Sequence, residues 1–103
     1  MNIEVSGRDK ALSEKVKAYA VQKAGKLSRY YDRLTSAKVV LAEKEGNHKA
    51  EIVVAAAGGK TLVGETSGSE TYYAAIDTVM EKMEKQVKKH KEMLIQRNRK
   101  GQA

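Results

Sequence analysis

The chain has 103 residues, of which 41% are hydrophobic and 32% are charged, and it contains neither cysteine nor proline. This length holds one small domain, and the composition is typical of a globular chain rather than a disordered one. The absence of cysteine excludes disulfides and thiolate metal sites. The N-terminus lacks the pattern of a signal peptide, and no apolar run reaches the roughly 20 residues that span a bilayer. We therefore expect a cytoplasmic protein without a membrane partner.

The formal net charge of +7 is concentrated in two segments. Residues 8–33 and residues 80–103 each carry a net charge of +5, whereas the rest of the chain carries −3. Positive charge clustered in this way favours a polyanionic partner such as a nucleic acid. The alternative is a basic soluble protein whose charged helix faces are only solvated.

The N-terminal third of the chain predicts a strand followed by a helix. Residues 1–6 alternate between apolar and polar side chains, which indicates a half-buried strand that ends at Gly7. Apolar residues then recur at steps of three and four, so residues 14–30 are predicted to form an amphipathic helix. Ser13 precedes this helix and has a side chain suited to an N-cap.

The rest of the chain predicts three strands and a long helix. The strands are expected at residues 37–43, 48–57 and 60–66. Gly58-Gly59 is a tight hairpin signal between the last two of them. Ser67 and Glu70 have the spacing of a capping box, and the helix is predicted from about residue 70 to about residue 95.

The resulting order, β-α-β-β-β-α, predicts an α+β fold with a four-stranded mixed sheet. The first helix is a crossover, so the first two strands should be parallel, and the short turns that follow indicate an antiparallel meander. Each helix has one apolar stripe, so both helices should pack on one face, as in a double-stranded-RNA-binding domain. We expect one domain over residues 1–96 and a short basic C-terminal tail over residues 97–103. The core is predicted to contain Ile3, Val5, Val16, Leu27, Val39, Leu41, Ile52, Val54, Ile76, Val79, Met83 and Val87.

Cations line the predicted solvent side of both helices. On a helical wheel they lie opposite or beside the apolar stripes, and helices packed side by side would join them into one basic surface. A soluble helix also carries lysines there without any ligand, which is the alternative interpretation. The candidate phosphate-binding residues are Lys23, Lys26, Arg29, Lys82, Lys85, Lys88 and Lys89.

No motif in the sequence indicates catalysis. Gly59-Lys60-Thr61 resembles the end of a phosphate-binding loop, but Val54 stands where that loop requires glycine. His48 and His90 are isolated and have no cluster of carboxylates around them. We therefore predict no catalytic residue, no metal site, no cofactor and no enzymatic activity.

Two segments resemble a known family. Tyr73-Ala74-Ala75-Ile76-Asp77 and the later Lys85-Gln86-Val87 and Lys89-His90-Lys91 are similar to the last helix of the ribosome hibernation promoting factors and ribosome-associated inhibitors. Lys26-Leu27, followed by Tyr30-Tyr31-Asp32-Arg33, is similar to the end of their first helix. The order of elements also matches, and the resemblance covers essentially the whole chain.

The resemblance implies a factor that inactivates ribosomes during stress or stationary phase by occupying them, without catalysis. Such a factor binds the small ribosomal subunit in the channel of messenger RNA and the transfer RNA anticodons, and promotes or stabilises inactive ribosome dimers. Its partners would be ribosomal RNA, ribosomal proteins and a separate ribosome modulation factor. The helix cations would then contact phosphates of ribosomal RNA, and we expect the free protein to be a monomer.

Two other functions fit the sequence. A general RNA- or DNA-binding module would bind naked duplex about as well as it binds ribosomes. A protein-interaction modulator that uses the open sheet face would keep its activity when the helix lysines are removed.

Overall fold

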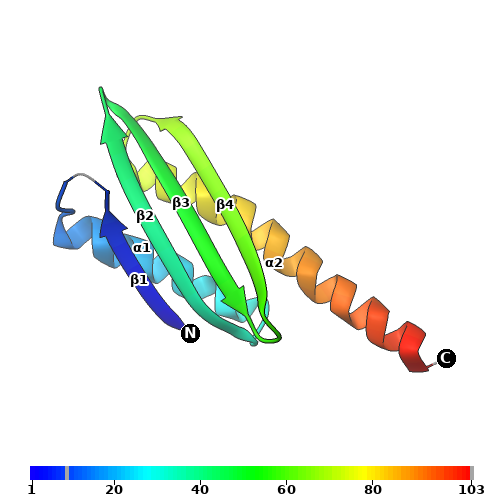
Figure 1. The fold of residues 1–103 in the computed structure, drawn as a ribbon. Coiled ribbons are helices and arrows are strands. Elements are labelled where there is room, and N and C mark those ends of the chain that lie inside the picture. The colour runs from blue at the N-terminus through cyan, green and yellow to red at the C-terminus, as the bar shows by residue number, and fades with distance from the viewer. Residues whose placement is uncertain (9, 103) are drawn as a thin grey trace.

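The computed structural model describes the backbone of residues 1–8 and 10–102 and the side chains of residues 1–8 and 10–95. Its elements follow the predicted order (Figure 1). They are β1 (Asn2–Gly7), α1 (Glu14–Gly25), the 3₁₀ helix η1 (Lys26–Arg29), β2 (Leu34–Lys44), β3 (Asn47–Ala56), β4 (Lys60–Ser69) and α2 (Tyr72–Gln102).

The four strands form one mixed sheet in the order β1-β2-β3-β4. β1 pairs with β2 in parallel, and the two later pairs are antiparallel, as predicted. Both helices lie on the same side of the sheet, where α1 packs against β1 and α2 packs against β3 and β4 (Figure 1). The α+β fold class is thus confirmed, and the opposite face of the sheet is left open.

The core lies between the sheet and the two helices. Alternate residues of the central strands are fully buried there, including Val39 and Leu41 of β2 and Ile52 and Val54 of β3. Ten of the twelve predicted core residues are buried. The other two, Ile3 and Val5, are partly buried against the core, because β1 is an edge strand with a neighbour on one side only.

The first helix begins as predicted and ends earlier. The backbone N–H of Val16 donates to Ser13 Oγ at 3.2 Å, which confirms Ser13 as the N-cap. α1 ends at Gly25, and the last predicted turn is the 3₁₀ segment Lys26–Arg29. Glycine is a poor helix former, and a 3₁₀ turn is a common way for a helix to end.

The predicted capping box before the second helix is wrong. β4 continues to Ser69, which pairs with His48, so Ser67 belongs to a strand. The cap is Thr71 instead, whose Oγ1 accepts a hydrogen bond from the backbone N–H of Ala74 at 3.0 Å. The backbone of α2 continues to Gln102, so the segment expected to be a tail is helical in its backbone, and its side chains lie outside the described residues.

Gly64 sets how closely α2 approaches the sheet. A Cβ atom at this position of β4 would lie 2.6 Å from the sulfur of Met83, which is well inside van der Waals contact. The absent side chain therefore lets α2 lie directly on β4, close to the free edge of that strand. Within the part of the chain that the structure describes, no helix has the length and apolar character needed to cross a membrane.

Candidate nucleic-acid interface

Four of the seven candidate cations are exposed and unpaired among the described side chains. Lys26 and Arg29 project from η1, and Lys85 and Lys89 project from the outer side of α2. None of the four takes part in an ion pair with a described residue. These are the cations that a polyanion can reach without first displacing a protein partner.

Two further candidates are held in ion pairs between or along the helices. Lys23 Nζ lies 3.7 Å from Asp77 Oδ1 and 5.3 Å from the centre of the Tyr19 ring. Lys88 Nζ donates to Glu84 Oε1 at 2.9 Å, one helical turn away along α2. This hydrogen bond holds the pKa of the Glu84 carboxyl below its ordinary value and raises the pKa of the Lys88 ammonium.

The seventh candidate, Lys82, makes a hydrogen bond to the backbone at the edge of the sheet. Its Nζ donates to the carbonyl oxygen of Glu65 at 3.0 Å, and Gln86 Nε2 donates to the carbonyl oxygen of Val63 at 2.9 Å. In an antiparallel ladder, alternate residues direct their backbone groups away from the neighbouring strand. Lys82 and Gln86 thus cover two backbone acceptors on the free edge of β4, which would otherwise be open to another strand.

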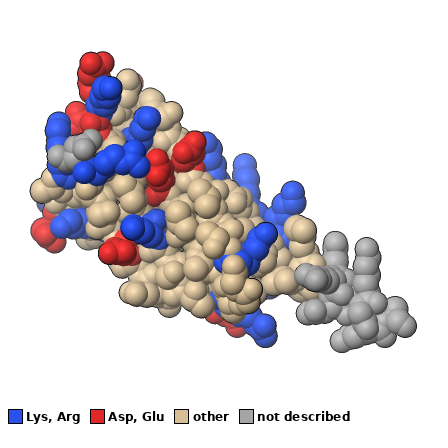
Figure 2. Space-filling model, viewed as in Figure 1, with Lys and Arg blue, Asp and Glu red and all other residues tan. Residues whose placement is uncertain are grey.

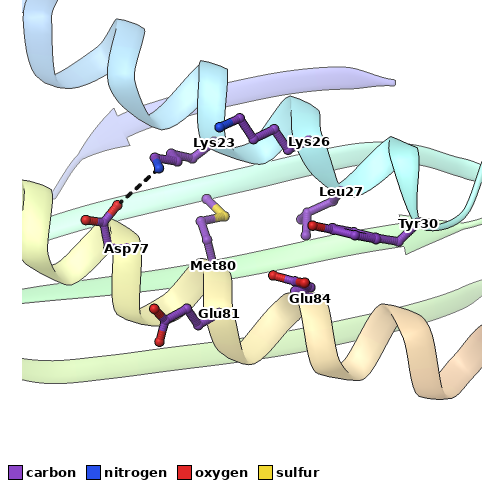
Figure 3. Close-up of a pocket in the computed structure, with 8 residues that line it drawn as sticks. All are labelled: Lys23, Lys26, Leu27, Tyr30, Asp77, Met80, Glu81 and Glu84. Carbon is purple, nitrogen blue, oxygen red and sulfur yellow. Dashed lines mark ion pairs between the residues drawn. The ribbon is translucent and has the colours of Figure 1, made fainter.

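A groove separates the basic sides of the two helices (Figure 3). The wall formed by α1 and η1 carries two lysines, whereas the α2 wall carries three carboxylates. The prediction of one continuous basic surface is therefore wrong, because carboxylates at the border of the α2 wheel turn toward α1. The groove has a volume of about 350 Å³ and is lined by Lys23, Lys26, Leu27, Tyr30, Asp77, Met80, Glu81 and Glu84.

Tyr19 links the two helices at the end of this groove. Its hydroxyl donates to Asp77 Oδ1 at 2.5 Å, and its ring meets Tyr73 edge to face with 5.0 Å between the ring centres. The hydrogen bond to Asp77 is the main reason why the pKa of Tyr19 is raised. Asp77 thus receives both Tyr19 and Lys23 from α1, which fixes α1 against the first turns of α2.

The open sheet face differs from the helix side. Figure 2 shows an uncharged centre with cations and carboxylates mixed toward the end of the sheet near the β2–β3 turn. Val53 and Val63 are 40% and 58% exposed on this face. Lys49 of β3 shares a pocket with Lys82 near the β4 edge. No local sequence pattern indicates that Lys49 and Gln86 lie near the β4 edge, because only the folded sheet brings β3, β4 and α2 together.

Among the side chains of residues 1–8 and 10–95, no three of His, Asp or Glu gather in a group that could hold a metal ion. What the fold and the side chains define is a small α+β domain with cations distributed over a two-helix face.

The chain belongs to the family described as sigma 54 modulation protein / S30EA ribosomal protein, whose model matches residues 3–95. It is 30% identical over 97 residues to the ribosome hibernation promoting factor of Azotobacter vinelandii, which covers 94% of this chain and 89% of the relative. It is 28% identical to the ribosome hibernation promoting factor of Escherichia coli, with 93% and 99% of the two chains covered. The family resemblance predicted from the sequence is confirmed.

Solved structures show the same fold. The crystal structure of the Thermus thermophilus Protein Y N-terminal domain matches with a TM-score of 0.79 and 35% identity, covering 87% of this chain and 99% of that chain. A ribosomal subunit interface protein from Coxiella burnetii matches with a TM-score of 0.77 over 88% of this chain and 98% of that chain. Its identity of 21% makes it a match of fold alone.

Proposed function

We propose that this chain is a ribosome hibernation factor, which binds ribosomes and regulates translation by holding them inactive. The observation that carries the proposal is the family match over residues 3–95, together with relatives named ribosome hibernation promoting factor that align over nearly their whole length. The family indicates a binding protein rather than an enzyme.

The proposed mechanism is occupancy of the small ribosomal subunit in its decoding channel, where the bound domain excludes messenger RNA and transfer RNA. The helix side is the proposed contact surface, because cations from two helices project from it. Lys26, Arg29, Lys85 and Lys89 supply the first phosphate contacts, and Lys23, Lys82 and Lys88 supply further ones when they exchange their protein partners for phosphate. Contacts of this kind recognise shape and charge rather than base sequence.

The proposed partners are ribosomal RNA and ribosomal proteins of the small subunit, and a separate ribosome modulation factor. With that factor, the chain would promote or stabilise inactive ribosome dimers, while the free protein is a monomer.

A second candidate function uses the open sheet face to bind a protein. The exposed Val53 and Val63 favour it, because neighbouring apolar side chains on a sheet face are suited to a protein contact. This function predicts that removal of the helix cations leaves binding intact. The hibernation proposal predicts instead that their removal weakens binding.

Co-sedimentation with purified ribosomes and subunits at several salt concentrations tests the proposal. If about six phosphates are contacted, log K falls with log salt with a slope of roughly −4 to −5. We expect preference for the small subunit over naked duplex RNA, and inhibition of translation in a reconstituted system. Equal affinity for naked duplex would indicate a general RNA-binding module, and a flat salt dependence would indicate the protein-binding candidate.

A further inference from the structure

A tyrosine and a lysine of α1 meet one carboxylate of α2 at the first end of the groove. The Tyr19 hydroxyl donates to Asp77 Oδ1 at 2.5 Å, and Lys23 Nζ lies 3.7 Å from the same oxygen. Lys23 Nζ also lies 5.3 Å from the centre of the Tyr19 ring. We call this group of Tyr19, Lys23 and Asp77 the first clamp, because it holds α1 to the first turns of α2.

A second group of the same composition lies about two turns further along α2. Lys88 Nζ donates to Glu84 Oε1 at 2.9 Å and lies 4.6 Å from the centre of the Tyr30 ring. Tyr30 ends η1, and its hydroxyl is directed across the groove toward Glu84 (Figure 3). The Lys88 ammonium, and to a lesser degree the Tyr30 hydroxyl, hold the pKa of the Glu84 carboxyl below its ordinary value. Tyr30, Glu84 and Lys88 form the second clamp.

Two clamps constrain the helices more than one clamp does. Asp77 and Glu84 are seven residues apart on α2, which is about 10 Å along the helix axis. A single attachment would let α1 and η1 pivot on α2, whereas two attachments fix both the separation and the angle. The groove of about 350 Å³ lies between the helices on this side, so close packing does not set their separation there. The clamps therefore bridge the part of the helix interface that is open to solvent.

The clamps lie among the cations that are proposed to contact phosphate. Lys26 and Arg29 of η1 lie between Lys23 and Tyr30 in the chain, and Lys85 and Lys89 of α2 each follow a member of the second clamp. Folded RNA presents its phosphates at fixed positions and is recognised by shape, whereas a flexible polyanion adapts to any spacing of cations. Groups that are held in place before binding also lose less freedom when they bind.

We infer that Tyr19 and Tyr30 are positioning residues of the RNA contact surface, which hold the cations of η1 and α2 at the separation that folded RNA requires. The identity of the RNA rests on the proposed function, but the fixed separation of the helices does not. Asp77 and Glu84 then lie on a basic face because they anchor tyrosines of the other helix segment. If they only neutralised neighbouring lysines, the two hydroxyls would have no role in binding.

The double substitution Tyr19→Phe/Tyr30→Phe tests this role in ribosome binding. It removes both hydroxyls and keeps both rings, every cation and the net charge. We expect affinity for ribosomes to fall roughly tenfold, because each side chain that must be ordered on binding costs about two- to twelvefold in affinity. The salt slope should stay the same, because the number of contacted phosphates is unchanged. Affinity for inorganic polyphosphate, a flexible chain, should also stay the same.

Tyr72→Phe is the matched control. Tyr72 is a partly buried tyrosine of α2 whose ring contacts His48, and it does not line the groove. This variant should bind ribosomes like the parent protein. Urea denaturation identifies conditions in which every variant is folded, and the two single Phe variants give the same comparison if the double variant unfolds. Parental ribosome affinity in the folded double variant, or equal losses for ribosomes and polyphosphate, would overturn the positioning role.

A distance measurement on the free protein separates this inference from the proposed function. The chain contains no cysteine, so Arg29→Cys/Lys89→Cys carries two spin labels without a competing thiol. Pulsed electron paramagnetic resonance should give a narrow distance distribution between η1 and α2, and removal of the two hydroxyls should broaden or shift it. An identical distribution overturns the inference whether or not ribosomes are bound. A broadened distribution in a protein that does not sediment with ribosomes supports the clamps and overturns their assignment to ribosomal RNA.

Discussion

The double substitution Lys85→Ala/Lys89→Ala gives the sharpest test of where the polyanion binds. Both side chains are exposed on the outer side of α2, and neither is paired with a described residue. Exposed substitutions of this kind usually change the free energy of unfolding by less than about 0.5 kcal/mol. The variant should therefore fold like the parent protein, so that any change in ribosome binding reports on contacts and not on stability.

The expected loss of affinity follows from counterion release. Each phosphate contact contributes roughly 0.7–0.9 to the slope of log K against log salt. At about 0.1 M salt, one lost contact then lowers affinity about five- to eightfold, and two lost contacts lower it about 25- to 60-fold. The slope should become flatter by about 1.4–1.8.

The matched control is Lys38→Ala/Lys44→Ala, which removes the same charge from the sheet. Lys38 lies on β2, and Lys44 ends that strand beside the hairpin turn. Lys49 is unsuitable as a control because it shares a pocket with Lys82. Co-sedimentation at three salt concentrations measures both affinity and slope for each variant. Equal losses from the two folded variants would refute a located helix-side contact and leave only attraction by net charge.

Three further predictions concern the fold. Val54→Asp places a charge at a position that is 0% exposed and should lower the free energy of unfolding, measured by urea denaturation, by several kcal/mol. An unfolding midpoint equal to that of the parent protein would contradict the assigned core. Thr71→Ala removes the N-cap of α2 and should cost about 1 kcal/mol, measured in the same way, whereas no change would assign the cap elsewhere. The hydrogen bond to Asp77 raises the pKa of Tyr19 in the folded protein. This bond therefore stabilises the fold fully below the unfolded pKa of about 10, and that stabilisation is lost as the pH rises through the pKa of the folded protein. As the pH is raised into the alkaline range, the melting temperature of Tyr19→Phe should therefore fall less than that of the parent protein. Identical dependence of the melting temperature on pH in the two proteins would contradict this linkage.

The order of elements and the core could be predicted because they depend on local periodicity. The alternation in β3 and the three- and four-residue steps in α2 follow directly from which side chains face the sheet and the helices. Element ends were less predictable. Ser67 has the chemistry of a cap, but pairing of Ser69 with His48 across two strands extends β4 beyond it. Tertiary pairing decided that boundary, and no local pattern carries such information.

In the candidate site, too, local periodicity predicts some features and tertiary contacts decide the others. A helical wheel correctly places Lys85 and Lys89 on the outer side of α2, because the opposite side is buried in the core. The wheel gives no information about the two sides of α2 between its buried and outer sides, because their surroundings depend on which element lies next to them. Lys82 meets the β4 edge on one flank, and Glu81 and Glu84 meet α1 on the other. These neighbours are set by sheet order and helix packing, so the wheel alone predicted a single basic surface.

The distribution of cations around α2 also limits what each can contribute to affinity. A phosphate that contacts Lys85 or Lys89 displaces no hydrogen bond between described residues. One that recruits Lys82 uncovers the carbonyl oxygen of Glu65, and one that recruits Lys88 leaves Glu84 without its partner. Counterion release depends on the number of phosphates neutralised, whereas the free energy of binding also includes the protein contacts that are broken. Lys82 and Lys88 should therefore steepen the salt dependence as much as Lys85 and Lys89 do, while adding less to affinity.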